Sequence, residues 1–74
     1  MYKQDIGINA GVIWRLLSDK SALSIREIGE FTHYHEMFLF LALGWLARED
    51  KIRFYEKGGA LYVKLEGAAS GWYF

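Results

Sequence analysis

The sequence of 74 residues contains no cysteine, no surplus of charge of either sign and no hydrophobic run of membrane-spanning length. Without cysteine there is neither a disulfide nor a thiolate metal site, and this composition fits a reducing compartment, so we expect a cytoplasmic protein. The longest apolar run, Met37 to Ala47, is shorter than the about 20 residues that cross a bilayer. Asp5 and Asn9 interrupt the first stretch, which therefore predicts no secretory signal peptide.

The charges of the chain cancel, because nine lysine and arginine residues are balanced by nine aspartate and glutamate residues. A dedicated DNA-binding domain usually carries a basic surplus, since the release of counterions from phosphates supplies much of its affinity. The neutral balance weighs against strong DNA binding but leaves room for a local basic patch. Apolar side chains are abundant, with 53% hydrophobic and 18% aromatic residues, which favours one small domain with a well-filled core.

Turn signals divide residues 1–50 into three helical segments. Asn9 is a suitable N-cap for the first helix, which then runs to about Lys20. Its predicted buried face follows the spacing i, i+3, i+4, i+7 and consists of Ala10, Ile13, Trp14 and Leu17. Leu23 then forms a short extended bridge, and Ser24 with Glu27 forms a capping box at the start of the second helix.

The second and third helices are separated by a turn at His33, a residue type that tolerates left-handed backbone better than most. The predicted buried side of the second helix consists of Ile25, Ile28 and Phe31. The third helix runs from about His35 to Glu49, and its predicted core stripe consists of Leu39, Ala42, Leu43 and Leu46. A second apolar stripe on this helix consists of Phe38, Leu41 and Trp45. One small domain cannot easily bury both stripes, so the second predicts a protein interface, with cover from the first helix or the end of the chain as the alternative.

Two alternating segments, 52–57 and 60–66, flank Gly58 and Gly59 and predict a β-hairpin with a type I′ turn. Pairing Lys57 with Ala60 places Phe54 opposite Val63, and Ile52 opposite Leu65, on an apolar face that must lie on the helices. Three helices, a short first strand and a C-terminal hairpin wing describe an α+β winged helix-turn-helix. We expect this domain to span residues 1–66.

Three stretches of the sequence are distinctive: IGINAGVIW from Ile6 to Trp14, LSIREI from Leu23 to Ile28, and ALGWLAREDKI from Ala42 to Ile52. The last is the most specific, because a Gly-Trp pair inside a helix is followed by an acidic and basic exit into a strand. From about Asp5 to Leu65 the chain resembles a family of very small bacterial winged helix-turn-helix proteins, common in Bacteroides-like bacteria, whose function is unassigned. The resemblance implies the fold and a regulatory or DNA-related role, and it brings no catalytic residues.

The outer face of the predicted hairpin is the best candidate for nucleic-acid binding. It carries Arg53, Tyr55, Lys57, Tyr62 and Lys64. Arg53 and Lys64 stand opposite each other, which is unfavourable unless an anion such as a phosphate lies between them. Arg26, on the second helix, could add a phosphate contact. The alternative is a solvated sheet face whose long basic side chains cover the tyrosine rings.

The third helix argues against base reading, because its first turns present Met37, Phe38 and Phe40, whereas bases and phosphates are read by polar and basic groups. His33, His35 and Glu36 supply too few converging ligands for zinc, and no motif predicts a cofactor, a small-molecule substrate or catalysis. We therefore predict a non-enzymatic domain with two functions left open. One is weak duplex DNA binding through the wing in a regulatory setting, and the other is self-association as a homodimer without nucleic acid.

Residues 67–74 differ from the rest, because small residues lead to Trp72, Tyr73 and Phe74. We expect a flexible, aromatic-ended C-terminal tail that docks on the second stripe of the third helix, in the same chain or in a partner copy. A frayed end is the alternative.

Overall fold

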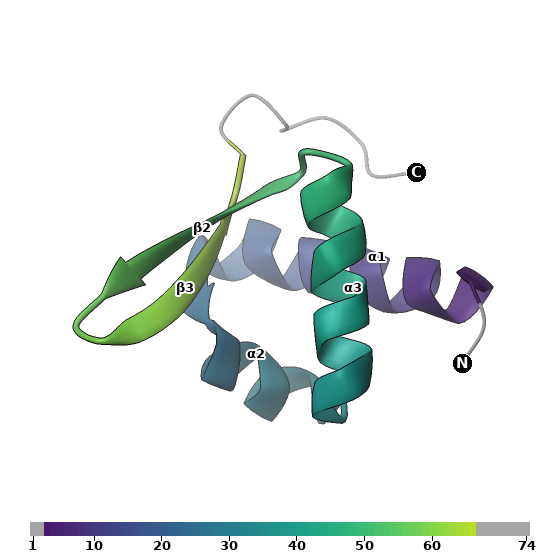
Figure 1. Ribbon diagram of the computed structural model, residues 1–74, viewed down its shortest axis with the longest axis horizontal. Coiled ribbons are helices and arrows are strands. Elements are labelled where there is room, and N and C mark those ends of the chain that lie inside the picture. The colour runs from purple at the N-terminus through teal and green to yellow at the C-terminus, as the bar shows by residue number, and fades with distance from the viewer. Residues whose placement is uncertain (1–2, 67–74) are drawn as a thin grey trace.

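The architecture is that of three helices and one antiparallel sheet, as predicted. The computed structural model describes residues 3–66, and the predicted tail at 67–74 lies outside them. The elements follow one another as α1 (Lys3–Lys20), β1 (Ala22–Ser24), α2 (Ile25–Thr32), α3 (Glu36–Arg48), β2 (Ile52–Lys57) and β3 (Ala60–Leu65). In Figure 1, α3 crosses in front of α1, and the β2–β3 hairpin projects to one side of the helices. Within residues 3–66, no helix has the length and apolar character needed to cross a membrane.

The first helix is longer than predicted, because α1 begins at Lys3 and not behind Asn9. Asn9 therefore lies inside the helix, and its prediction as an N-cap is wrong. Lysine and glutamine are good helix formers, and Asp5 in the first turn complements the helix dipole, so the segment before Asn9 extends the helix. The extension adds Gly7 and Ile8 to the surface of α1.

The start and end of α2 are as predicted. The Ser24 side chain accepts a hydrogen bond from the Glu27 amide at 3.0 Å, and the Ser24 amide donates to the Glu27 carboxylate at 2.8 Å. His33 ends the helix in the left-handed conformation with φ 61°. The predicted burial of Phe31 is wrong, since its side chain is 52% exposed. It lies in the last turn of this short helix, where the Lys20 Nζ is 5.2 Å from the ring centroid.

The sheet has the strand order β1-β3-β2, and all pairs are antiparallel. The predicted hairpin register is confirmed, with Lys57 paired to Ala60 across Gly58 and Gly59, which both have positive φ. Ile52 and Val63 are buried against the helices, but Phe54 on the same face is exposed. The hairpin projects past the helices, so the apolar face nearer its turn is not covered by them.

The core draws on all three helices and the three strands. Its buried apolar residues are Ala10, Ile13, Leu17, Leu23, Ile28, Leu39, Ala42, Leu43, Leu46, Ile52 and Val63. The predicted core stripe of α3 is confirmed in full, as are three of the four predicted residues of α1, while Trp14 is half-buried at the edge of the core. Other large apolar side chains are partly buried around this core, and a further group, which includes Ile8, Met37 and Phe40, is exposed.

Candidate interaction surfaces

The outward side of α3 is apolar over most of its length. It presents a set of residues that we call the α3 face: Met37, Phe40, Leu41 and Gly44. Met37 is 62% exposed and Leu41 is 43% exposed, and Phe40 is similarly open to solvent. Charged residues occur only near the two ends of the helix, with Glu36 in the first turn and Arg48 in the last. In a helix-turn-helix protein this is the side that would have to approach base edges, and it offers few groups able to read them.

The predicted second stripe is divided between two sides of α3. Leu41 belongs to the exposed α3 face, whereas Phe38 and Trp45 are half-buried, and Trp45 packs against the core. At about 100° per residue, Phe38 and Trp45 lie about 90–110° around the helix from the centre of the core stripe, whereas Leu41 lies about 150° from it. Phe38 and Trp45 therefore lie on one flank of the helix, between the core stripe and the α3 face.

The wing also carries exposed apolar side chains. Leu61 and Phe54 lie on the helix-side face of the hairpin, and both are exposed near its turn. A shallow depression between α2, α3 and the wing is lined in part by Leu39, Phe40 and Leu61. The α3 face and the wing thus meet at Phe40 and Leu61, which line the same depression.

The charged groups of this depression are mainly acidic. Glu27, Glu30 and Glu36 line it, together with Arg26, the one base among its described lining residues. The Arg26 Nε lies 3.4 Å from the Glu30 Oε2, and both side chains are well exposed, so this ion pair contributes little to stability. A phosphate approaching Arg26 would also approach these carboxylates, which is electrostatically unfavourable.

The outer wing face is the sheet face of Arg53, Tyr55, Lys57, Tyr62 and Lys64. The Tyr55 and Tyr62 rings stack with centroids 5.5 Å apart. The Lys64 Nζ lies 5.5 Å from the Tyr55 centroid, and the Lys57 Nζ lies 6.0 Å from the Tyr62 centroid. Each lysine therefore has an aromatic ring as a cation–π partner. This arrangement agrees with the alternative of a solvated sheet face whose long basic side chains cover the tyrosine rings.

The predicted pairing of Arg53 with Lys64 across β2 and β3 is confirmed. An external phosphate is not required to offset their repulsion, because the Arg53 Nε lies 3.2 Å from the Glu66 Oε2. The anion beside Arg53 is thus a carboxylate of the same chain. The outer wing face brings together the predicted basic and aromatic residues, but its arginine is already in an ion pair.

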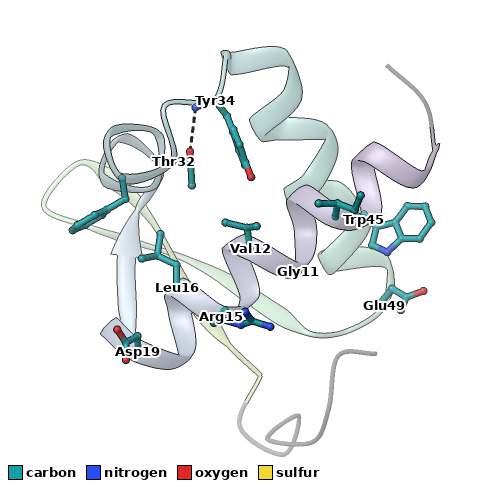
Figure 2. Close-up of a pocket in the computed structure, with 12 residues that line it drawn as sticks. Gly11, Val12, Arg15, Leu16, Asp19, Thr32, Tyr34, Trp45 and Glu49 are labelled. Atoms are coloured by element: carbon teal, nitrogen blue, oxygen red, sulfur yellow. Dashed lines mark hydrogen bonds between the residues drawn. The ribbon is translucent and has the colours of Figure 1, made fainter.

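A groove runs between α1 and the C-terminal half of α3 on another side of the molecule. This α1–α3 groove is lined by Gly7, Ile8, Gly11, Val12, Arg15, Leu16, Asp19, Phe31, Thr32, Tyr34, Trp45 and Glu49. Figure 2 shows Val12 and Leu16 of α1 on one side, with Trp45 of α3 and the Tyr34 ring, which points toward Val12, around them. Ile8 is 63% exposed, and Val12 and Phe31 are also open to solvent.

Tyr34 is held at the edge of the groove by the turn between α2 and α3. Its amide donates a hydrogen bond to the Thr32 Oγ1 at 3.2 Å, and that hydroxyl donates to the Ile28 carbonyl at 2.8 Å. Partial burial of the phenol raises its pKa above the usual value. The groove is thus mainly apolar, with polar groups at its margins. Among residues 3–66, no group of three His, Asp or Glu side chains is placed to hold a metal ion.

Sequence reasoning did not identify Met37, Phe40 and Leu61 as one exposed region, and it missed the groove. A signal for the first was present, because counting about 100° per residue from the core stripe places Met37, Leu41 and Gly44 opposite the core. For the groove there was no such signal. Its lining comes from α1, the α2–α3 turn and α3, and their juxtaposition depends on how the helices cross.

Three comparisons with known proteins each find similar proteins, and one of them identifies the family. The model of a winged helix-turn-helix domain family (DUF2582) matches residues 1–65. The uncharacterized protein MJ1608 of Methanocaldococcus jannaschii is 45% identical over 49 residues, which cover 64% of this chain and 70% of that protein. The solution NMR structure of protein BT2368 from Bacteroides thetaiotaomicron superimposes with a TM-score of 0.80 at 34% identity, over 95% of this chain and 85% of that one.

Proposed function

Because this chain belongs to the winged helix-turn-helix domain family DUF2582, and helix-turn-helix proteins in general bind through the recognition helix, to which α3 corresponds, we propose that it uses α3 and the wing to bind protein. The partner is a second copy of the chain, held through the α3 face with Leu61 at its edge. The domain acts as a non-enzymatic interaction module. The observation that carries the proposal is the exposure of Met37, Phe40 and Leu41 where a DNA-reading helix needs polar groups.

The apolar character of the α3 face favours a protein partner. Contiguous apolar surface of this kind is typical of interfaces, because its burial removes it from water. The charges at the two ends of α3 favour a second copy in particular. A two-fold axis across the helix would pack two α3 helices antiparallel, and Glu36 of one copy would then lie near Arg48 of the partner subunit. The face is self-complementary in both apolarity and charge.

Gly44 also supports a close partner. It lies in the interior of α3, and a Cβ at this position would have nothing within 4 Å, so packing within the described residues does not require glycine here. Glycine costs a helix roughly 0.5–1 kcal/mol relative to alanine. A residue without a side chain at the middle of the α3 face allows the backbone of another helix to approach it.

The test is the oligomeric state of a charge-neutral double variant, Met37→Glu with Leu41→Lys. We expect the wild-type protein to form dimers in analytical ultracentrifugation as its concentration rises, and the variant to stay monomeric with an unchanged circular dichroism spectrum. The matched control, Ile8→Lys with Val12→Glu, places the same charges in the α1–α3 groove and should leave the dimer intact. A wild-type protein that is monomeric at millimolar concentration, or a dimer that only the groove variant breaks, would exclude the α3 face.

Weak binding of duplex DNA through the outer wing face is the second candidate. It is favoured by the two lysines and two tyrosines that share this face, with Arg53 beside them. Titration into a labelled random-sequence duplex at low and moderate salt tests it, since phosphate contacts weaken steeply with salt. Replacing Arg53 and Lys64 together by glutamate should abolish such binding without loss of the fold. An affinity that does not change would end this candidate.

A further inference from the structure

We infer that the α1–α3 groove is a docking site for residues 67–74 of the same chain, with Trp72, Tyr73 and Phe74 covering its apolar lining. This intramolecular site is distinct from the proposed dimer surface. It differs from the docking expected from the sequence, because the contact surface is the groove formed with α1 and not a stripe of α3 alone.

The exposed apolar lining of the groove favours an apolar occupant. Ile8, Val12 and Phe31 are exposed around it, and Leu16 and Trp45 are only half-buried. These side chains come from three separate helices and line one groove. Covering them with aromatic rings would bury apolar surface on both partners, which is the main favourable term in such a contact.

Glu66, the last of the described residues, lies near this groove. The Glu66 amide donates a hydrogen bond to the Lys51 carbonyl at 2.9 Å, and Lys51 follows Glu49, which lines the groove, by two residues. The six residues from Glu66 to Trp72 span up to about 20 Å when extended. The part of α1 from Ile8 to Leu16 is about 12 Å long at the rise of a helix. The three aromatic residues can therefore reach its apolar lining.

The composition of the segment suits such a path. Gly67, Ala68, Ala69, Ser70 and Gly71 are small and can pass close to a helix without steric conflict. On α1, Gly7 has nothing within 4 Å of the position that a Cβ would take, and Gly11 also lines the groove. Gly7 therefore leaves space above the helix backbone that an aromatic ring can fill.

The segment of the same chain is favoured over the same segment of a second copy by effective concentration. A short tether holds the aromatic residues near the groove at a concentration on the order of millimolar. A second copy at micromolar concentration competes poorly with it. The α3 face is a less accessible target, because Met37 lies at the end of α3 far from Glu49.

The test uses one spin label on the full-length protein. Since the chain has no cysteine, Ser70→Cys provides a single attachment site. We expect the label to broaden the backbone amide signals of residues 8–16 and 45–49 in ¹⁵N spectra, while those of residues 57–60 at the hairpin turn stay sharp. The matched control carries the same label with Trp72, Tyr73 and Phe74 replaced by serine. It should lose the selective broadening.

A second sample separates the same chain from a partner copy. Spin-labelled protein without ¹⁵N is mixed with unlabelled ¹⁵N protein, so that only contacts between copies broaden signals. Sharp groove signals in this mixture support the proposal, whereas broadened ones overturn it in favour of exchange between copies. Groove signals that stay sharp in the first sample also overturn it. Both samples are repeated with the Met37→Glu, Leu41→Lys variant, which is expected to be monomeric. The same result in this variant shows that docking in the groove does not depend on the proposed dimer.

Discussion

Tyr34 shows how one side chain couples the turn between α2 and α3 to the groove. The turn itself is set by His33, whose left-handed backbone ends α2, and by the Thr32 hydroxyl, which accepts a hydrogen bond from the Tyr34 amide. The phenol ring is directed toward α1, where it loses part of its contact with water (Figure 2). Burial disfavours the charged phenolate and so raises the pKa of Tyr34.

This raised pKa predicts a loss of stability in alkaline solution. In the unfolded chain the phenol loses its proton near pH 10, whereas the folded protein holds it to higher pH. The contribution is fully present below pH 10 and is lost as the pH rises through the folded pKa. We expect Tyr34→Phe to lose less of its free energy of unfolding than wild type between pH 9 and pH 11 in urea titrations. Parallel losses in the two proteins would contradict this prediction.

At the scale of one element, α3 has two sides with separate tasks. Its core stripe fixes the helix on α1 and the sheet, and its α3 face has no contact among the described residues that explains its apolarity. Packing within the described residues therefore explains the residue types on the core side of α3 but not those on the α3 face. The identity of Met37, Phe40 and Gly44 must be explained by something that the fold alone does not supply.

Substitutions at Gly44 separate the stability of the helix from contact with a partner. We expect Gly44→Ala to raise the free energy of unfolding by about 0.5–1 kcal/mol, since alanine is the better helix former and its Cβ meets nothing. Urea unfolding at low micromolar concentration, where association is weak, measures the effect. Gly44→Leu should keep a comparable stability but weaken the dimer, because its side chain stands in the approach of the second helix. A dimer of unchanged affinity in Gly44→Leu would exclude close contact at this position.

At the scale of the whole molecule, the distribution of charge limits any contact with nucleic acid. The net charge is zero, the depression beside α2 and α3 is mainly acidic, and the carboxylate of Glu66 pairs with Arg53 on the wing. On the side of α3 and the wing, acidic groups thus offset much of the positive charge. Duplex DNA would gain little from long-range attraction to such a protein.

Removing the ion pair between Arg53 and Glu66 should therefore strengthen DNA binding, the second candidate function. Glu66→Gln leaves nine basic and eight acidic residues, a net charge of +1, and removes the carboxylate beside Arg53. If the outer wing face contacts phosphates, we expect tighter duplex binding at low salt and a dependence of log K on log salt that is steeper by about 0.9. The control Glu56→Gln makes the same change of net charge on the opposite face of the hairpin. Equal effects of the two variants would exclude a specific role of Arg53.

The sequence by itself determined most of the local structure, because the forces behind it act over a few residues, although α1 begins earlier than predicted. The capping box at Ser24, the left-handed turn at His33 and the hairpin register at Gly58 and Gly59 each follow from backbone chemistry within one turn. The spacing of apolar residues likewise determined the core stripe of α3. These elements in their order were enough to specify the winged helix-turn-helix fold.

Tertiary structure decided which surfaces these elements leave exposed. Whether Phe31, Phe54 and Trp45 are covered depends on where neighbouring elements end, and periodicity within one helix or strand does not contain that information. The ion pair between Arg53 and Glu66 similarly depends on the exit of β3 beside β2. The candidate surfaces depend on the crossing of helices and the projection of the wing, which are properties of packing between segments far apart in the chain.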